Sequence, residues 1–567
     1  MKKRILSCLM ALALCLTLLP TAALAADGAQ AADGTVHKGH CLCGATHNSA
    51  ITNHGSNQNA FTDAKELKVE NGTLMKGGKE WKTESIKVWS TGDTNETVYQ
   101  LPAGTYYLGS NIEITQYPIM ITGNVVLCLN GKQITCGSPA PDCVIGVYAN
   151  TASELTLTDC GGAGQIAGGK NYGVKVYKGY TLNMHGGTIT GNGAGVEVNG
   201  SEGKTTKLNM YGGAISNNTG TGVRLTQYCT FTMSGGTISN NKGGVSTGSG
   251  EFTMSGGEIS GNTATSNGGG VNIGNGGTFT MNAGAKITQN TAGYAGGGVY
   301  VSGGTFIMNG GEIKSNIAET NGGGVFVTKV ASSSNSAFTM NGGEIKSNTA
   351  NTAGGGVFVD NGTFTVSGKP IVSENTSGSE GNKVTGNVYL CANKTITIGS
   401  GLTNGTDIGV TTGSAMAPTE DSTIAITTPT ENAHGYLSYF KSDNDSYEIV
   451  ANSTQTQLVL KARPKIDLTN SAAIKITSQS ADLVYTGKPI TVAYEVKYND
   501  KMLKLGEDYT VTGGSGTDAT DYTLKITGTG QYTGKVEKKW TITPLTVNVS
   551  SVTLREKEYD GDRKSVV

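Results

Sequence analysis

The segments FTMSGGEISGN (residues 252–262) and GGGVNI (residues 268–273) together decide the fold of this chain. The same phrase recurs between Tyr180 and Asn375 at intervals of 21 to 32 residues. A repeat of this length is typical of a solenoid, in which each copy forms one structural unit. The methionine position of the phrase is occupied in successive copies by Met184, Met210, Met233, Met254, Met281, Met308, Met340 and Val366.

Each copy contains three short segments that we predict to be β-strands. Residues 252–254 and 271–273 alternate apolar and polar side chains, and Val, Ile, Phe and Thr dominate, which indicates strand and not helix. Glycine pairs and triplets separate the segments and allow sharp corners, because glycine adopts positive φ without strain. The third segment carries an isoleucine with an asparagine three positions later: Ile189/Asn192, Ile215/Asn218, Ile238/Asn241, Ile259/Asn262, Ile287/Asn290, Ile313/Asn316 and Ile345/Asn348.

Three strands and three corners make one coil, which cannot bury its own apolar face. Coils stacked about 4.8 Å apart let each strand pair in parallel with its copies in the neighbouring coils. The inward Phe, Met, Ile and Val then form columns, and the recurring Asn is expected to form a hydrogen-bonded ladder at one corner. The sequence therefore predicts an all-β chain built on a parallel β-helix, right-handed because crossovers between parallel strands prefer that hand.

The repeat resembles those of bacterial surface β-helix proteins in the pectin-lyase-like superfamily, in particular the polymorphic outer-membrane-type repeat. The matching pieces are Gly-Gly-Gly-Val and Ile-x-x-Asn, and the likeness covers residues 95–460. The resemblance implies the fold. It implies little about activity, because this fold hosts lyases, hydrolases and adhesins alike.

Residues 1–25 have the pattern of a secretory signal peptide, with a basic start, an apolar run from Ile5 to Leu19 and small residues before Ala25. Residues 26–60 are predicted to be a flexible leader. Its cysteines and histidines could bind zinc, form a disulfide or have no role in a site, and all three interpretations are open. Secretion favours the disulfide, because extracellular cysteines are usually oxidised. The residues concerned are His37, His40, Cys41, Cys43, His47 and His54.

We predict an N-terminal cap with the first coils over residues 61–122 and the parallel β-helix over residues 123–460. A change of period near Pro464 indicates an immunoglobulin-like β-sandwich over residues 465–544, which resembles modules that bacterial surface proteins carry in tandem. The start of a second, truncated module is expected over residues 545–567. The early coils contain four cysteines: Cys128, Cys136, Cys143 and Cys160. They could form disulfides in three different pairings or remain buried free thiols, and the sequence leaves both possibilities open.

The repeat is poor in the groups that catalysis needs. No Asp occurs between Cys160 and Val359, and the one Arg there is Arg224. Ca²⁺ sites and glycoside hydrolysis both need carboxylates. We expect neither Arg224 nor His185 to be catalytic.

Three glutamates share one repeat position: Glu258, Glu312 and Glu344. The last two fall in successive copies and are expected about 5 Å apart, the separation of a retaining glycosidase pair. The favoured interpretation is an outward, tolerant position, because a charge on a strand usually lies on a solvated face. Lys314 and Lys346, two positions further on, would then screen the two carboxylates.

The predicted function is that of a secreted or cell-surface, adhesin-like structural protein whose extended face binds an extracellular glycan or a surface protein. The alternative is a polysaccharide lyase or glycoside hydrolase, with its site in the coils before Tyr180 or near Asp407, Glu420 and Asp421. A net charge of −1 gives no basic surface for nucleic acid, and nothing after the signal is apolar enough to span a bilayer. No catalytic, cofactor-binding or metal-binding residue is assigned.

Overall fold

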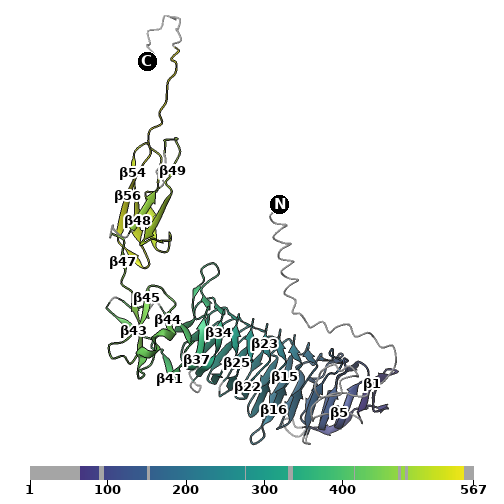
Figure 1. Cartoon of the computed structure of the whole chain (residues 1–567). Helices are drawn as coiled ribbons and strands as arrows, with labels where there is room; N and C mark the ends of the chain where they lie inside the picture. Colours follow the sequence, from purple (N-terminus) through teal and green to yellow (C-terminus); the bar gives the residue numbers. More distant parts are fainter. Residues whose placement is uncertain are drawn as a thin grey trace, which may run out of the picture.

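The computed structural model confirms an all-β chain whose strands stack into one long parallel ladder, the predicted parallel β-helix (Figure 1). The predicted signal peptide and the His37–His47 leader lie outside the described residues, and so does residue 420. The structure describes residues 64–88, 95–149, 153–274, 276–329, 336–413, 416–419, 421–469, 474–478 and 483–553.

The coils have three faces, each named here by its inward side chains. The Phe-Met face contains β19 (Cys229–Met233), β22 (Glu251–Met254), β26 (Thr278–Met281) and β30 (Thr305–Met308). The Ile face contains β20 (Thr237–Ser239), β23 (Glu258–Ser260), β27 (Lys286–Thr288) and β31 (Glu312–Lys314). The Val face contains β25 (Val271–Ile273), β29 (Val299–Ser302), β33 (Val325–Thr328) and β36 (Val357–Val359).

Equivalent residues of successive coils are partners in these ladders. Phe252 pairs with Phe279, and Met254 with Met281, so one repeat lies directly on the next. Six phenylalanines form an interior column with ring centroids 4.5–5.0 Å apart and interplanar angles of 4–12°. Burial of these rings supplies much of the stabilisation, because each aromatic side chain removes a large apolar area from water. The column consists of Phe231, Phe252, Phe279, Phe306, Phe338 and Phe364.

The expected asparagine ladder is confirmed at the corner that follows the Ile face. We call it the inner ladder; all its members are buried: Asn192, Asn218, Asn241, Asn262, Asn290, Asn316, Asn348, Asn375 and Asn387. From Asn192 to Asn375, each side-chain Nδ2 donates to the Oδ1 of the next asparagine at 2.9–3.0 Å. Each backbone N–H donates to the same Oδ1. The buried amides therefore satisfy one another, as buried polar groups must.

The inner ladder ends on a carboxylate. Asn387 donates from its backbone N–H to Asp443 Oδ2 at 2.7 Å and from Nδ2 to Asp443 Oδ1 at 2.6 Å. The Thr411 hydroxyl also donates to Asp443 Oδ2, at 2.9 Å. Burial raises the pKa of Asp443 above its ordinary value, although these hydrogen bonds oppose the shift. Asp443 thus supplies the acceptor that the next asparagine would have supplied.

A second asparagine ladder lies at the corner after the Phe-Met face, and the sequence did not lead us to expect it. This outer ladder is formed by Asn309 and Asn341, which are exposed, and by Asn282, which is half-buried. Asn309 Nδ2 donates to Asn282 Oδ1 at 3.0 Å, and Asn341 Nδ2 donates to Asn309 Oδ1 at 2.9 Å. The signal in the sequence is the residue that directly follows each methionine.

The later coils contain a fourth strand of two residues, which the three-strand prediction missed. These strands pair in parallel after the inner ladder: β24 (Thr263–Ala264), β28 (Thr291–Ala292), β32 (Ile317–Ala318), β35 (Thr349–Ala350) and β38 (Thr376–Ser377). Their inward residues, such as Ala264 and Ala292, are buried. A small residue recurring two positions after the asparagine was the available signal.

Both ends of the β-helix change from parallel to antiparallel pairing. At the N-terminal end, β1 (Lys65–Glu70) pairs in parallel with β5 (Asn95–Leu108) and in antiparallel with β2 (Thr73–Lys76). At the C-terminal end, the parallel ladder reaches β44 (Phe440–Ser442). We expected parallel coils as far as residue 460. Instead, antiparallel strands occupy the last part of that range: β43 (Thr423–Ala425), β45 (Tyr447–Ala451) and β46 (Leu458–Ala462).

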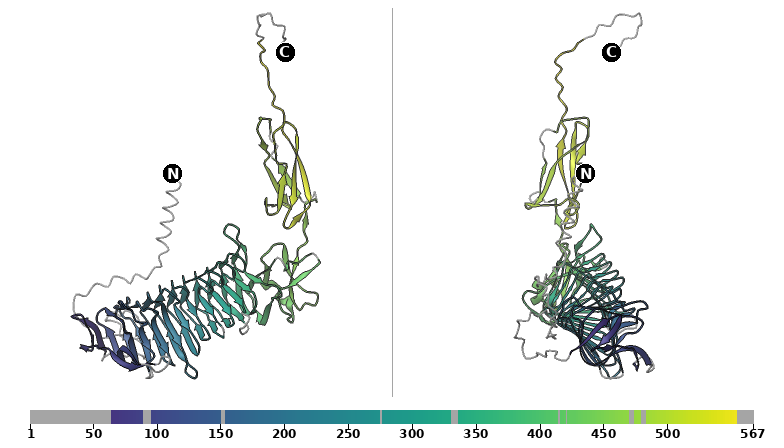
Figure 2. Two further views of the ribbon diagram at one scale, coloured as in Figure 1. Left: turned by 180° about the vertical axis from the view of Figure 1, so that it is seen from behind. Right: turned by 90° about the vertical axis from the view of Figure 1, so that its right-hand side faces the viewer.

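The chain beyond Pro464 forms a separate unit of short β-sheets, from β47 (Ile466–Asp467) to β56 (Lys535–Thr541) (Figure 2). Most of its strand pairs are antiparallel, as between β54 (Asp521–Gly528) and β56. Its core around Leu524 and Trp540 is distinct from the core of the coils. The predicted immunoglobulin-like topology of this unit stays a prediction. In the described parts of the chain, no helix is long and apolar enough to cross a membrane.

Candidate functional site

The outward side chains of the Val face form one continuous column whose chemistry changes along the rod. Strand registers connect its members in this order: Lys175, Glu197, Arg224, Ser246, Asn272, Tyr300, Phe326, Phe358 and Tyr389. The N-terminal part is charged, the middle is polar and the C-terminal part is aromatic. Because the backbone register is uniform, these differences lie in the side chains alone.

A group of tyrosines surrounds Lys175 at the charged end of this column. The ammonium Nζ lies 5.6, 5.4 and 5.2 Å from the ring centroids of Tyr148, Tyr172 and Tyr177, within the range of cation–π attraction. It also donates to Asp142 Oδ2 at 3.0 Å. Burial alone would lower the pKa of Lys175, but the hydrogen bond and charge of Asp142 outweigh it, so this pKa is raised. Lys175 is therefore a fixed cation.

Glu197 completes what we call the tyrosine–lysine cluster. Its carboxylate is buried and accepts a hydrogen bond from the Tyr177 hydroxyl at 2.5 Å. The Tyr148 hydroxyl donates to Glu96 Oε2 at 3.2 Å. Burial raises the pKa of both Tyr148 and Tyr177, and the neighbouring carboxylates add to the shift. Both phenols therefore keep their protons at neutral pH and act as hydrogen-bond donors.

The fold builds this cluster by covering the outside of the early coils. Its members come from β5, β12 (Tyr172–Tyr177) and β15 (Ala194–Asn199), and from the residues directly before and after β9 (Cys143–Val147). The antiparallel pair β4 (Glu84–Lys87) and β5 contributes to a second apolar cluster, in which Val88 and Val98 pack with Met120, Cys143 and Tyr148. The sequence reasoning missed this site. The available signal was the group of charged and aromatic residues on either side of Tyr180 in the sequence.

The aromatic end of the Val-face column is a ring stack. Neighbouring rings from Tyr300 through Phe326 and Phe358 to Tyr389 have centroids 5.4, 5.2 and 4.9 Å apart and interplanar angles of 5–9°. Phe326 and Phe358 are only 7 % and 8 % exposed. Since the ring faces within the stack are occupied by other rings, this column is not a platform on which a sugar ring could lie flat.

The outward side of the Phe-Met face carries two ranks of threonine. The first rank contains Thr230, Thr278, Thr305 and Thr363, and the second contains Thr232, Thr253, Thr280, Thr339 and Thr365. All of them are half-buried or exposed. Glu251, Ile307 and Ala337 interrupt the ranks. Adjacent hydroxyls within a rank repeat at the strand spacing of about 4.8 Å, so this face presents a regular lattice of donors and acceptors.

The glutamate pair lies where the repeat predicted it. Glu312 and Glu344 are partners in the register of the Ile face, and the column continues from them to Lys286 and Glu258. Glu312 pairs with Lys314 at 3.4 Å, and Glu344 pairs with Lys346 at 3.2 Å. The two carboxylates are 32 % and 43 % exposed. A glycosidase acid needs an environment unlike that of its partner, whereas these two glutamates share one solvated setting.

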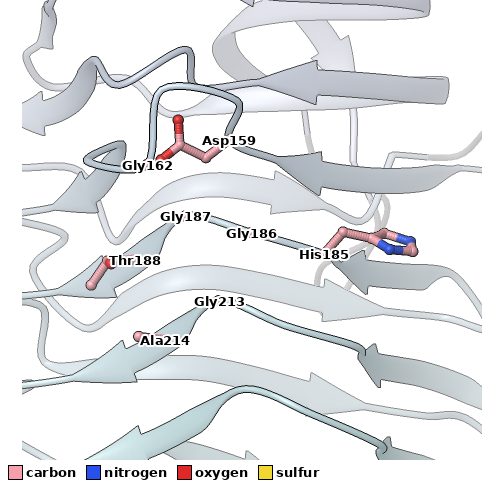
Figure 3. Close-up of a pocket in the computed structure, with 8 residues that line it drawn as sticks. All are labelled: Asp159, Gly162, His185, Gly186, Gly187, Thr188, Gly213 and Ala214. Atoms are coloured by element: carbon pink, nitrogen blue, oxygen red, sulfur yellow. The ribbon is translucent and has the colours of Figure 1, made fainter. Parts of the chain in front are cut away.

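The remaining predicted candidates are scattered. His185 stacks on Tyr211, with centroids 4.5 Å apart, and burial lowers its pKa. It borders a hollow of about 210 Å³ together with Asp159, but the two side chains extend in different directions (Figure 3). The Asp159 carboxylate instead accepts three backbone N–H groups, those of residues 131, 161 and 164. Arg224 lies on the Val face, away from His185.

Of the residues predicted near the C-terminal end of the coils, the structure describes Asp407 and Asp421. Asp407 is paired with Lys441 at 2.7 Å, and Asp421 is exposed. Among the described residues, no group of three His, Cys, Asp or Glu side chains is placed to hold a metal ion. The arrangement as a whole offers rows of outward hydroxyl groups and one partly buried polar cluster. The chain matches no protein-family model, no curated protein and no solved structure.

Proposed function

We propose that this protein is a non-catalytic, adhesin-like surface rod that binds an extracellular glycan along the Phe-Met face. The observation that carries the proposal is the double rank of threonine hydroxyls, held in register over successive coils. A parallel ladder fixes these hydroxyls before any ligand arrives, so binding does not incur the cost of ordering them. Many weak, equally spaced contacts suit a repeating polymer better than a small molecule.

Charge supports a neutral partner. The two threonine ranks contain a single charged residue, Glu251, among the members given above. A glycan with repeating hydroxyls can exchange hydrogen bonds with such a face. The basic residue in register with the first rank, Lys207, lies at its N-terminal end beside Thr230. The predicted signal peptide and the resemblance to bacterial surface repeats favour display outside the cell. On the same ground, the unit over residues 465–544 is proposed to be an immunoglobulin-like stalk module.

A glycan array probed with the purified full chain tests this proposal. The variant Thr253→Val/Thr280→Val/Thr339→Val removes three hydroxyls of one rank and keeps β-branched side chains of the same shape. The matched control, Thr188→Val/Thr190→Val/Thr237→Val, alters the Ile face instead. We expect saturable binding by the wild type and the control and a loss of at least about tenfold in the rank variant, which is 1.4 kcal/mol. Equal binding by all three proteins would rule out this face.

A carbohydrate-active enzyme is the second candidate, and the tyrosine–lysine cluster favours it. A buried carboxylate, two protonated phenols and a fixed ammonium lie together in the less regular coils. Incubation with a polysaccharide panel, followed by assays for reducing ends and unsaturated products, distinguishes the two functions. Turnover that disappears in Glu197→Gln would replace the adhesin proposal. Binding without turnover would leave the enzyme without support.

A further inference from the structure

The sulfur atoms of two cysteines touch across successive coils. Cys128 Sγ lies 3.2 Å from Cys160 Sγ, although the residues are 32 positions apart in the sequence. Cys128 is the last residue of β7 (Ile119–Cys128), and Cys160 comes just after β10 (Glu154–Thr158). These two strands are parallel neighbours in the ladder, with Leu127 paired to Leu157 and Cys128 paired to Thr158. Both thiols therefore lie at the same corner, one coil apart.

The backbone around this corner is held firmly in place. Asp159, directly before Cys160, accepts hydrogen bonds from the backbone N–H groups of Gly131 at 2.7 Å, Gly161 at 3.2 Å and Gly164 at 2.6 Å. One of these donors belongs to the coil of Cys128 and two belong to the turn of Cys160. The carboxylate thus ties the two coils together on either side of the sulfur pair. Disulfide formation needs only a small approach of the two sulfur atoms, because the bonded distance is about 2.05 Å.

The other described cysteines in these coils have different neighbours. Cys143 lies 3.9 Å from the Tyr148 hydroxyl, inside the apolar cluster beneath β4 and β5. Thiol acidity does not distinguish these cysteines, because the pKa is raised by burial for Cys136 and Cys143 and by the hydrogen bond with Cys128, together with burial, for Cys160. Of the three pairings that the sequence left open, the one that joins Cys128 to Cys160 is the one that this geometry favours.

We propose that Cys128 and Cys160 form a disulfide that crosslinks two successive coils. The oxidant is a small-molecule or protein disulfide, of the kind found in oxidising extracytoplasmic compartments. One cysteine thiolate attacks that disulfide, forms a mixed disulfide and releases one thiol. The second cysteine thiolate then attacks the mixed disulfide, closes the Cys128–Cys160 bond and releases the second thiol. Two cysteine thiols are oxidised and one disulfide is reduced to two thiols, so electrons and protons balance.

The crosslink would act where the parallel ladder begins. A disulfide restricts the unfolded chain and so opposes separation of the coils that it joins. These coils carry the tyrosine–lysine cluster and lack the phenylalanine column of the later repeats. The inference is independent of the proposed glycan binding, because a crosslink in the early coils does not involve the threonine ranks.

Peptide mapping of the full chain, refolded with glutathione disulfide, tests the proposal. Remaining thiols are alkylated under denaturing conditions, and the digest is analysed without reductant. We expect one crosslinked species that joins the Cys128 and Cys160 peptides and is two hydrogen masses lighter than their sum. Recovery of both cysteines in alkylated form, or a crosslink of either to another cysteine, would overturn the proposal.

Thermal unfolding provides the second readout. We expect a reductant to lower the Tm of the wild type and of Cys229→Ser, which replaces a buried cysteine at the start of β19. The Tm of Cys128→Ser/Cys160→Ser is expected not to respond to the reductant. An equal response by all three proteins would contradict the proposed crosslink. If the double variant does not fold, the peptide map of the wild type still decides the question.

Discussion

Two corners of the same coils carry asparagine ladders with the same hydrogen-bond lengths and opposite surroundings. In both the inner and the outer ladder, Nδ2 donates to a neighbouring Oδ1 at 2.9–3.0 Å. The inner ladder is buried, whereas the outer ladder faces water. A buried amide that loses its partner has no water to replace it, while an exposed amide does. The comparison teaches that geometry alone does not measure what a ladder contributes to stability.

The largest effect should come from breaking the inner ladder at its centre. Asn290 donates to Asn316 Oδ1 and to the Ile259 carbonyl, and its Oδ1 accepts two hydrogen bonds from Asn262. Asn290→Leu keeps a similar side-chain volume but leaves several buried polar groups without hydrogen-bond partners, and each such group costs about 1–3 kcal/mol. We expect a loss of about 4 kcal/mol in the free energy of unfolding, measured by urea denaturation. A loss below that of an exposed asparagine would contradict the role assigned to burial.

The next effect concerns the end of the inner ladder. Asp443→Leu leaves the Asn387 N–H and Nδ2 without an acceptor, so we expect a loss of about 3 kcal/mol. Asp443→Asn is the matched control, because one amide oxygen accepts both donors at every other step of the ladder. It should cost about 1 kcal/mol or less. Equal losses in the two variants would show that the Asn387 hydrogen bonds do not determine stability here.

The wild type and Asp443→Asn together give a test of pH dependence. Burial raises the pKa of Asp443, so the folded chain binds this proton more readily than the unfolded chain does. Stability from this source is present at low pH and is lost as the pH rises through the folded-state pKa. Relative to Asp443→Asn, the wild type should therefore gain stability as the pH falls from 7 toward the ordinary aspartate pKa of about 4. A relative loss over that range would reverse the assigned sign.

The exposed ladder should respond much less than either buried position. Asn309 bonds to Asn282 and Asn341 with lengths close to those of Asn290, but water can take the place of each partner. Asn309→Ala is expected to change the free energy of unfolding by less than about 0.5 kcal/mol. Urea denaturation alongside Asn290→Leu makes the comparison direct. A loss as large as that of Asn290→Leu would mean that ladder geometry outweighs burial.

The smallest effect belongs to His185, which occupies the corner position that asparagine holds in the outer ladder. Burial lowers the pKa of His185, so the unfolded chain binds this proton more readily. Stability from this source is present at neutral pH and is lost as the pH falls below the ordinary histidine pKa of about 6.5. The difference in urea midpoint between wild type and His185→Gln should narrow or reverse from pH 7 to pH 5. A difference in urea midpoint that does not change with pH would contradict this prediction.

The sequence predicted features that are encoded by the same residues in nearly every copy and missed features that are shorter or less regular. The phenylalanine column, the inner ladder and the Glu312–Glu344 register all follow from identical residues at the same position of each repeat, because stacking places equivalent positions of successive coils side by side. The two-residue strands were missed because two residues are too few for alternation to show. The outer ladder was missed because serine, histidine and tyrosine share its position with asparagine.

The tyrosine–lysine cluster could not be assembled from the sequence for a different reason. Glu96 and Tyr148 meet because β4 and β5 fold over the outside of the coils, and no period in the sequence encodes that contact. The Cys128–Cys160 contact depends likewise on the length of the loops between two coils. The threonine ranks were predictable in part. The threonines are visible in the sequence of the repeats, but their alignment across coils is known only from the strand register of the structure.

Every amide-to-amide hydrogen bond of the inner ladder runs toward the same end of the rod, so the asparagine of each coil accepts from the coil before it and donates to the asparagine of the coil after it. A whole coil that is gained or lost leaves this relation unchanged for its neighbours. The length of the rod can therefore change by duplication or deletion of single repeats, and no new residue is needed to cap the ladder. Asp443 still caps the last asparagine, so the number of coils before it can change during evolution without disturbing how each coil folds.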